Sequence, residues 1–299
     1  MGAFKGEYRC PVADIRDAAP DDFDAVFALL DARSVRAYGV PQEDRKFLRQ
    51  RWDLPGGGRW VAVDRDAIVG YAVLDENQDF SLAAVDPDVV DSLIAHVERN
   101  ARSRGFEHLA VTTVPEDVPL YEGAQRNGYT LDREILRMWR PLNGDLPEPR
   151  WPDGITVRTY DDADSERVHA LLDDAYAGWD ERYVARTHAG WLTFMTDHDE
   201  FDPALWFLVE RDGELVACAL HWKENQRRGW VKDIVVRDNE RGHGLGKALL
   251  HHGFGAYAQR GAERVGLKVD STNPTGAPEL YARVGFEIDQ RQGVWQKRL

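Results

Sequence analysis

Residues 229–258 contain the stretch on which the rest of the chain depends, and they read GWVKDIVVRDNERGHGLGKALLHHGFGAYA. The β-branched run from Val231 to Val236 predicts a strand, and the spacing of apolar residues from Leu245 onward predicts a helix. Between them lies Arg241-Gly242-His243-Gly244-Leu245-Gly246. Glycines at a strand-to-helix junction let a ligand approach the backbone, and the first N–H groups of a helix have no partner inside it. The junction therefore predicts an anion-binding site.

Three phosphate-binding patterns compete for this junction. A P-loop requires Ser or Thr after Gly-Lys, whereas Ala248 follows Gly246-Lys247. A dinucleotide fingerprint requires G-x-G-x-x-G, whereas the sequence has G-x-G-x-G. The third pattern fits: a valine-ended strand, a short turn and Arg241-x-x-Gly244-x-Gly246 resemble the coenzyme A pyrophosphate loop of the GNAT superfamily of N-acetyltransferases. A glycine-rich turn without a ligand is the alternative interpretation.

Composition narrows the class of protein. The chain has 299 residues, a formal net charge of −14 and 43% hydrophobic residues. The negative charge argues against nucleic acid as a partner and fits a cationic or neutral acceptor, although acidic residues also serve solubility. We expect no membrane span, because no apolar run reaches the length of a bilayer, and the N-terminus lacks a signal-peptide core. These features predict a cytoplasmic protein. Cys10 and Cys218 predict neither a disulfide framework nor a zinc site.

The two halves of the chain repeat one pattern. Ile15-Arg16 and Val157-Arg158 each precede a helical segment, and Leu120-Tyr121 has its counterpart in Leu280-Tyr281. Pro147, Pro149 and Pro152 mark a linker. The predicted division is a degenerate GNAT-like domain at 1–145, a linker at 146–154 and a catalytic domain at 155–299. The predicted fold class is α/β (α+β mixed): two tandem GNAT-like domains, each a mixed, mostly antiparallel sheet flanked by helices.

The halves differ at the expected cofactor loop. In the first half the helix that follows Ser81 to Val85 begins with an Asp cap and a proline, Asp86-Pro87, and its start has no glycine. Aspartates at that helix start would repel a pyrophosphate. We therefore expect acetyl-CoA to bind the second half alone.

The resemblance to GNAT enzymes implies a role for each residue of the second half that matches the family pattern. The strand at Ile234, Val235 and Val236 would splay from its neighbour and bind the pantetheine arm, and one of its N–H groups would stabilise the oxyanion. The backbone of Gly242, His243, Gly244, Leu245 and Gly246 would hold the pyrophosphate of acetyl-CoA. Arg241 and Lys247 would add positive charge, and Asn273 would bond the cofactor arm.

The resemblance also implies a general acid but leaves the base open. Tyr281 matches the family tyrosine that protonates the coenzyme A thiolate, and a phenol is protonated at neutral pH. Many relatives, including the tandem-domain mycothiol synthases, carry an acid six residues before the valine that matches Val236, where this chain has Trp230. The candidate bases are Asp233, Asp270, Glu224 and His221. Asp233 alternates with Val231 and Val235, which places it opposite Ile234 and Val236.

These features predict an acetyl-CoA-dependent N-acetyltransferase, a transferase that acylates a primary amine of a small molecule by direct attack. The alternatives are a peptide or protein N-terminal acetyltransferase and a non-catalytic acyl-CoA sensor. Aromatic and acidic residues before the sheet are candidates for an acceptor wall and equally for core packing: Tyr176, Trp179, Asp180, Tyr183, Trp191 and Phe194. The histidines lack ligand spacing, so we expect no metal. Both a monomer and a homodimer remain open.

Overall fold

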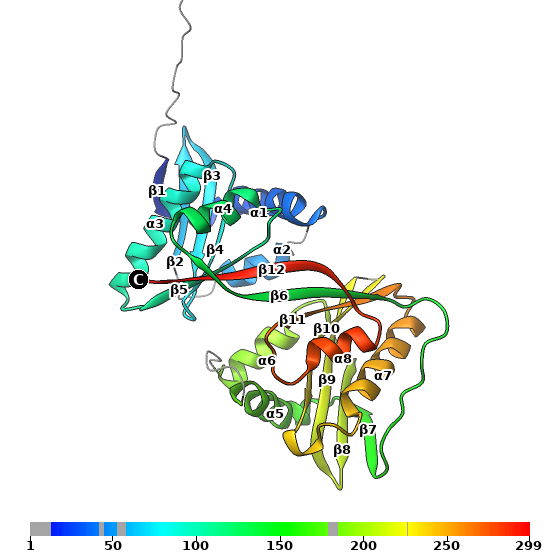
Figure 1. Ribbon diagram of the computed structural model, residues 1–299. Coiled ribbons are helices and arrows are strands. Elements are labelled where there is room, and N and C mark those ends of the chain that lie inside the picture. The colour runs from blue at the N-terminus through cyan, green and yellow to red at the C-terminus, as the bar shows by residue number, and fades with distance from the viewer. Residues whose placement is uncertain (1–12, 42–44, 53–57, 179–184, 226) are drawn as a thin grey trace, which may run out of the picture. The chain divides into compact units, whose positions relative to one another are not determined.

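The computed structural model describes residues 13–41, 45–52, 58–178, 185–225 and 227–299. The chain forms two compact units (Figure 1). Unit 1 consists of Met1–Glu134 with Gln292–Leu299, and unit 2 consists of Ile135–Arg291.

Unit 1 begins with a strand and two helices, continues with a three-stranded meander, and ends with two helices that alternate with strands. Its elements are β1 (Asp14–Asp17), η1 (Pro20–Asp22), α1 (Phe23–Tyr38), α2 (Arg45–Trp52), β2 (Gly58–Asp64), β3 (Ala67–Leu74), β4 (Asp79–Ala84), α3 (Pro87–Ser103), β5 (His108–Thr113), α4 (Val118–Arg126) and the start of β6 (Thr130–Pro141). The side chain of Asp86 caps α3 by accepting the Asp88 N–H at 2.8 Å, as the sequence predicts.

Unit 2 repeats this order of elements. They are β7 (Ile155–Thr159), η2 (Asp162–Asp164), α5 (Ser165–Ala177), α6 (His188–Thr196), β8 (Phe201–Arg211), β9 (Glu214–Asn225), β10 (Arg228–Val236), η3 (Asp238–Glu240), α7 (Leu245–Gln259), β11 (Arg264–Asp270), α8 (Ala277–Arg283) and the start of β12 (Glu287–Arg298). The predicted strand-to-helix junction of the opening stretch is therefore the passage from β10 to α7.

One ion pair occurs at the same place in both units. The Arg16 Nη1 atom of β1 lies 2.6 Å from the Asp22 Oδ2 atom, and the Arg158 Nη1 atom of β7 lies 2.6 Å from Asp164 Oδ2. Each pair joins the first strand to the turn before the first long helix. Because the arginine is the leading residue of the repeat found in the sequence, this contact accounts for its presence in both halves.

The strand order explains why the units differ from the sequence halves. In unit 1 the order is β1-β2-β3-β4-β5-β12, and in unit 2 it is β6-β11-β10-β9-β8-β7. Among the described strand pairs inside each unit, only β4–β5 and β10–β11 are parallel. The last strand of each half completes the other sheet, because β12 pairs with β5 and β6 pairs with β11. The predicted linker, 146–154, lies within unit 2, and the division into 1–145 and 155–299 remains our proposal for the repeated domains.

Helices cover both faces of each sheet (Figure 1). In unit 2, α7 and α8 pack on one face around Leu249 and Phe254, and α5 and α6 pack on the other around Trp206 and Met195. We call these the α7 face and the α5 face. The mixed sheet between two helical layers agrees with the predicted fold class, and it leaves the ends of β10 and β11 between the layers.

His221 is a buried histidine in the α7 core. Its ring lies against α7, where a Cβ atom on Gly253 would come within 2.7 Å of the ring, so the glycine makes room for the imidazole. Neither ring nitrogen has a hydrogen-bond partner among the described residues. Burial lowers the pKa of His221 to about 3, and the nearby His252 contributes further. These surroundings favour a packing role over that of a base.

A pH prediction follows for His221. The unfolded chain binds a proton at this residue below about pH 6.5, whereas the folded protein resists protonation down to about pH 3. The contribution of neutral His221 to the free energy of unfolding is therefore fully present above pH 6.5. Below pH 6.5 it falls by about 1.4 kcal/mol per pH unit. We expect His221→Leu to show a shallower loss of unfolding free energy in acid than the parent. Denaturant titrations from pH 7 to 4 test this, with exposed His243→Gln as the control. Parallel curves for parent and His221→Leu would contradict the assignment.

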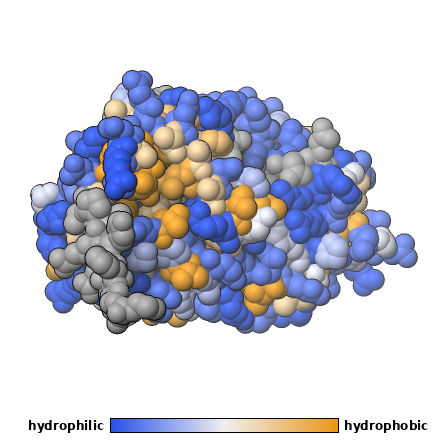
Figure 2. Space-filling view, turned by 90° about the horizontal axis from the view of Figure 1, so that it is seen from above, coloured by the Kyte–Doolittle hydropathy of each residue, from blue (hydrophilic) through white to orange (hydrophobic). Residues whose placement is uncertain are grey.

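Hydrophilic residues cover most of the face in Figure 2, in keeping with a chain whose net charge is −14. Within the described ranges, no helix combines the length and the apolar character that a bilayer crossing requires.

Candidate active site

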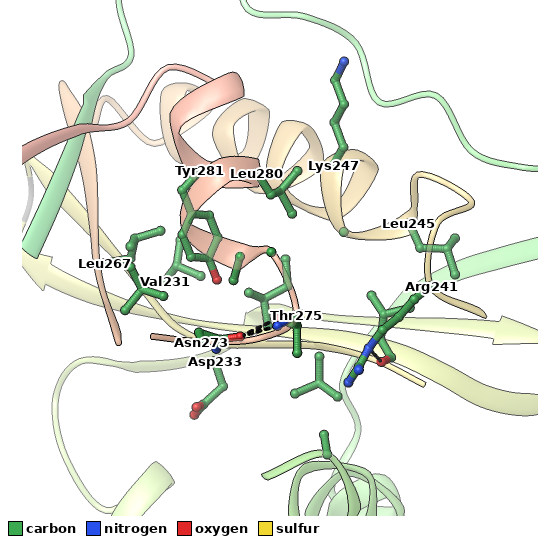
Figure 3. A pocket seen from close by; sticks show the side chains of 18 of the residues that line it. Val231, Asp233, Arg241, Leu245, Lys247, Leu267, Asn273, Thr275, Leu280 and Tyr281 are labelled. Atoms are coloured by element: carbon green, nitrogen blue, oxygen red, sulfur yellow. Dashed lines mark hydrogen bonds between the residues drawn. The ribbon is translucent and has the colours of Figure 1, made fainter. Parts of the chain in front are cut away.

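A pocket of about 540 Å³ lies where β10 and β11 meet the first turns of α7 and α8 (Figure 3). Its walls come from α5, β10, η3, α7, β11 and α8 of unit 2 and from the loops before α7 and α8. Most of the sequence-predicted site residues line it, namely Asp233, Ile234, Val235, Val236, Arg241, Gly242, Gly244, Leu245, Gly246, Lys247, Asp270, Asn273 and Tyr281. His243 is exposed and stands outside this set, with its Nδ1 atom 3.3 Å from the Glu240 carbonyl.

The two parallel strands separate at the pocket. Their ladder runs from the pair Arg228 and Arg264 to the pair Val231 and Leu267, although β10 continues to Val236 and β11 to Asp270. On the side of β11, the backbone of the last residues of β10 therefore borders the pocket, while its other edge stays paired with β9. This is the geometry that the family resemblance implies for a strand that binds an extended ligand through its backbone.

A β-bulge in β10 changes the direction of its side chains. Val231 pairs with His221 of β9 and Asp233 pairs with the next residue, Leu220, so Lys232 is the additional residue. Before the bulge Val231 packs into the α7 core, whereas Val235 packs into the α5 core and Ile234 returns to the α7 core. Asp233 shares the α5 face with Val235, opposite Ile234.

Asp233 is a buried carboxylate with two neighbours that can donate to it. Its exposed fraction is 8%. The Tyr176 hydroxyl of α5 donates to Oδ1, and the Lys232 ammonium lies 3.3 Å from Oδ2. Burial raises the pKa of Tyr176 well above its usual value, and the Asp233 charge raises it further. Tyr176 therefore stays protonated, and its hydroxyl fixes the orientation of the carboxylate.

Tyr281 lies on α8 on the opposite side of the same pocket. Its exposed fraction is 7%, its ring packs edge-on against Phe286 at a centroid distance of 5.9 Å, and its hydroxyl points into the pocket (Figure 3). Burial raises the pKa of Tyr281 above its usual value, with a smaller contribution from the Asp233 charge. A neutral phenol and a carboxylate thus line one pocket from opposite faces of the sheet.

The glycine loop leaves its backbone accessible. Gly242 and Gly244 have φ values of +83° and +88°, a region that strongly favours glycine, and a Cβ atom on either would have no heavy atom within 4 Å among the described residues. Gly244 is the N-cap of α7, so the free N–H groups of the helix start face this open space. These residues fit an anionic group such as a pyrophosphate.

The two cations beside the loop lie differently. The Arg241 Nε atom donates to the Val236 carbonyl at 3.1 Å, and its Nη2 atom lies 2.8 Å from the Asp238 carboxylate. Arg241 therefore ties the loop back to the end of β10. Lys247 extends from α7 away from Tyr281 and Asp233 in Figure 3.

The turn before α8 uses the side chains of Asp270 and Asn273. The Asp270 Oδ1 atom accepts the Thr272 N–H at 2.8 Å and the Thr272 hydroxyl at 2.7 Å. The Asn273 Oδ1 atom accepts the Thr275 N–H at 2.9 Å and the Thr275 hydroxyl at 2.6 Å. Both side chains thus shape this turn as well as lining the pocket.

The predicted acceptor wall is present in part. Tyr176 lines the pocket, whereas Trp191 is buried in the α5 core and Phe194 packs against that core. Trp179, Asp180 and Tyr183 lie outside the described residues, as does the side chain of Glu224. Lys268 of β11 also lines the pocket, and sequence analysis missed it because the residue belongs to no motif.

Unit 1 has different side chains at the equivalent place. Arg33 follows Arg16 by the same interval that separates Ala175 from Arg158, and Asp117 precedes Leu120 as Ala277 precedes Leu280. Ala175 and Ala277 both line the pocket of unit 2. In unit 1 the Arg33 Nε atom lies 2.6 Å from the Asp117 carboxylate, and both side chains are largely buried. An ion pair therefore lies where small residues leave the pocket open in unit 2.

Comparisons with known proteins identify the family to which this architecture belongs. The model of the acetyltransferase (GNAT) family matches residues 165–286, which lie within unit 2. The mycothiol acetyltransferase of Streptomyces coelicolor is 32% identical over 92% of this chain and 91% of its own length. That of Geodermatophilus obscurus is 30% identical over 96% of this chain and 97% of its own.

Solved structures agree with these relatives. The crystal structure of a GCN5-related N-acetyltransferase from Sphaerobacter thermophilus has a TM-score of 0.75 and 26% identity, with 95% of each chain covered. A tandem GNAT protein from the clavulanic acid biosynthesis pathway has the same fold, with a TM-score of 0.74, 17% identity and coverage of 95% of this chain and 98% of its own. The chain belongs to the GNAT family and is an N-acetyltransferase with tandem GNAT-type domains. Among its relatives it is similar along nearly its whole length to mycothiol acetyltransferases.

Proposed function

We propose that the pocket of unit 2 binds acetyl-CoA and that the enzyme transfers the acetyl group directly to a primary amine of a small molecule. One observation carries this proposal: a buried carboxylate, Asp233, and a neutral phenol, Tyr281, line the pocket that opens between the separated strands β10 and β11. A base for the amine and an acid for the thiolate are the two groups that direct transfer requires.

Binding of acetyl-CoA would follow the shape of the pocket. The N–H groups of residues 242–246 would hold the pyrophosphate at the start of α7. The free edge of β10 at Ile234, Val235 and Val236 would bind the pantetheine arm, and an N–H of this edge would stabilise the developing oxyanion. Asn273 would bond the same arm through the amide group that its turn does not use. Arg241 would hold the loop in place from the end of β10.

The chemical step uses one acid and one base. The amine nitrogen attacks the thioester carbonyl carbon and loses its proton to Asp233, directly or through a water molecule. The C–S bond then breaks, and the departing thiolate takes the proton of the Tyr281 hydroxyl. Asp233 is preferred to Asp270 as the base because Asp233 is buried in the pocket, whereas Asp270 is half-buried and holds the turn before α8 through two hydrogen bonds from Thr272. The products are the acetylated amine and free coenzyme A.

The bulge accounts for the absence of an acid at Trp230. Lys232 is the additional residue of the bulge, so Asp233 takes the same face as Trp230 and lies beyond Val231, the last residue of β10 that pairs with β11. Asp233 can therefore supply to the pocket the carboxylate that many relatives carry at the position of Trp230.

Direct transfer is favoured over a covalent enzyme intermediate by the state of the thiol. Cys218 is fully buried in the α5 core, and burial raises the pKa of its thiol, with a further contribution from Asp233. A buried neutral thiol is a poor nucleophile. Cys10 lies outside the described residues.

The acceptor is proposed to be a small molecule because the relatives are named for mycothiol and not for a protein. The decisive experiment measures release of free coenzyme A from acetyl-CoA in the presence of a panel of amines and of N-terminal peptides. Acetylation of free amines in preference to peptides supports the proposal. Preference for peptides would favour an N-terminal acetyltransferase, and tight acetyl-CoA binding without turnover of any acceptor would favour a sensor.

Gly244 offers a test of the pyrophosphate site. Gly244→Val should weaken acetyl-CoA binding at least tenfold, because the side chain would enter the space in front of the first turn of α7. The φ of +88° adds strain of about 1–3 kcal/mol. Gly213→Val is the matched control, since Gly213 has a φ of +82° and equally open space in the β8–β9 turn. Isothermal calorimetry at a temperature where both variants are folded should show weaker binding for Gly244→Val alone. Equal losses of acetyl-CoA affinity in Gly244→Val and Gly213→Val would show that backbone strain, and not the position of Gly244, causes the effect.

Stoichiometry tests the difference between the units. We expect one acetyl-CoA per chain, because α3 of unit 1 starts at a capping carboxylate and the Arg33–Asp117 ion pair lies where unit 2 has its pocket. Calorimetric titration should give a single site that Gly244→Val weakens. Two equivalent sites would show that unit 1 also binds the cofactor.

A further inference from the structure

Three tryptophans form a row across the α5 face of the unit 2 sheet. Trp222 of β9 is the direct antiparallel partner of Trp230 of β10, Trp230 is the parallel partner of Gly266 of β11, and Gly266 is the antiparallel partner of Trp139 of β6. Directly paired residues of neighbouring strands project from the same face of a sheet. The row, which we call the tryptophan face, therefore crosses four strands.

Gly266 brings two of the indoles together. A Cβ atom on this residue would lie 2.7 Å from the Trp230 ring and 2.8 Å from the Trp139 ring, so a larger side chain would displace both. The Trp139 and Trp230 rings meet edge-on with their centroids 5.6 Å apart. All three tryptophans are only half-buried, so apolar ring surface remains in contact with solvent. Such surface next to a pocket is a feature of ligand sites.

The tryptophan face lies beside the proposed base. Trp230 and Asp233 point to the same face of β10 because of the bulge at Lys232. Lys232 lines the pocket, and its ammonium lies 5.5 Å from the centroid of the Trp222 ring. An acceptor whose amine reaches Asp233 would thus extend its body over Trp230 and Trp139.

Cations accompany the tryptophans although the chain as a whole carries a net charge of −14. The Arg264 guanidinium lies 4.3 Å from the centroid of the Trp139 ring. Lys268 follows Gly266 by two residues on β11, so it projects from the same face, and it lines the pocket. Within the part of the chain that the structure describes, no carboxylate lies within ion-pair distance of its ammonium. Burial lowers the pKa of Lys268 to about 8, with a further contribution from Arg137, so the ammonium stays charged at neutral pH. A desolvated cation without an anionic partner is complementary to an anionic group on a ligand.

We propose that the tryptophan face and Lys268 form the acceptor subsite, and that the acceptor is a primary amine whose body contains a flat ring bearing an anionic group. The ring would lie on Trp230 and Trp139, and the anion would pair with Lys268. This inference rests on the proposed function for the position of the amine at Asp233. It revises the expectation, drawn from net charge, of a cationic or neutral acceptor, because local charge and not the total acts on a bound ligand.

Four probe amines separate the two parts of the proposal. Benzylamine has a ring and no carboxylate, and 4-(aminomethyl)benzoate has both. Butylamine has neither, and 4-aminobutyrate has a carboxylate and no ring. Calorimetry with the coenzyme A-loaded protein measures binding of each probe independently of turnover. We expect 4-(aminomethyl)benzoate to bind most tightly, by at least about tenfold over benzylamine and over 4-aminobutyrate. Equal affinities for all four probes would overturn the proposal.

Two variants assign the effects to residues. Lys268→Met should abolish the preference for the carboxylate and keep the preference for the ring, and Lys223→Met, at an exposed lysine of β9, is its control. Trp230→Leu should abolish the preference for the ring and keep that for the carboxylate, with Trp151→Leu as its control and Trp139→Leu as a second variant if Trp230→Leu does not fold. Preferences unchanged in Lys268→Met and in a folded tryptophan variant would overturn the subsite. If the probes bind in the expected order but none is acetylated, the subsite is supported and the proposed acetylation of such amines is refuted.

Discussion

Asp233→Asn is expected to lower kcat/KM for the amine acceptor about a thousandfold while acetyl-CoA affinity stays within about twofold. Asparagine keeps the size of the side chain and still accepts the hydrogen bond of the Tyr176 hydroxyl. It cannot take a proton from the attacking amine, so the loss should appear in the chemical step. Single-turnover kinetics with saturating acetyl-CoA measure this step directly.

Asp270→Asn is the matched comparison, because Asp270 is a carboxylate that lines the same pocket from the end of β11. We expect this variant to retain the rate within about tenfold and to lose some stability, since Asp270 accepts two hydrogen bonds from Thr272. A large loss of rate in Asp270→Asn with a nearly normal Asp233→Asn would exchange the roles of the two residues.

Tyr281→Phe is expected to lower the rate of acetyl transfer at least a hundredfold, because the departing thiolate would lose its proton donor. The phenylalanine ring can keep the edge-on contact with Phe286, so the fold should change little. Acetyl-CoA affinity should stay near that of the parent, and the effect should fall on kcat and kcat/KM alike, which marks an interaction made only in the transition state.

Tyr121→Phe controls for the loss of a tyrosine hydroxyl at the same repeat position in unit 1, where Leu120-Tyr121 corresponds to Leu280-Tyr281. We expect it to leave the rate unchanged. If Tyr281→Phe turned over acceptor as fast as the parent under conditions where chemistry limits the rate, water or the acceptor would be the proton donor. Loss of rate in both variants would indicate a general effect on stability.

The pH profile offers an independent check on Tyr281. Burial raises its pKa above the usual value of 10, so the acid form persists across the alkaline range. The acetyl-transfer rate should therefore show no descending limb from Tyr281 up to about pH 10. A fall in the parent near pH 8 that is absent in Tyr281→Phe would contradict the raised pKa of Tyr281, although it would still mark the protonated hydroxyl as the acid.

Much of the second half could be predicted from sequence because its signals are local. The β-branched run, the glycines and the apolar spacing after Leu245 require only neighbouring residues, and the structure has β10, the loop and α7 where they predict them. The Asp86 cap and Pro87 at the start of α3 are confirmed for the same reason. The repeat was also visible, since Arg16 and Arg158 make the same contact in each unit.

The sequence by itself determined the tandem repeat, the glycine-rich strand-to-helix junction and the family, because these depend on local spacing. Tertiary structure alone decided which strand completes which sheet, since β6 and β12 pair with strands far away in sequence. It also decided that Asp233 lies on the same face as Trp230, because the bulge at Lys232 depends on the register with β9 and strict alternation would put the two residues on opposite faces. The tryptophan face has the same origin: Trp139, Trp222 and Trp230 become neighbours only when pairing across four strands brings their side chains to one face of the sheet.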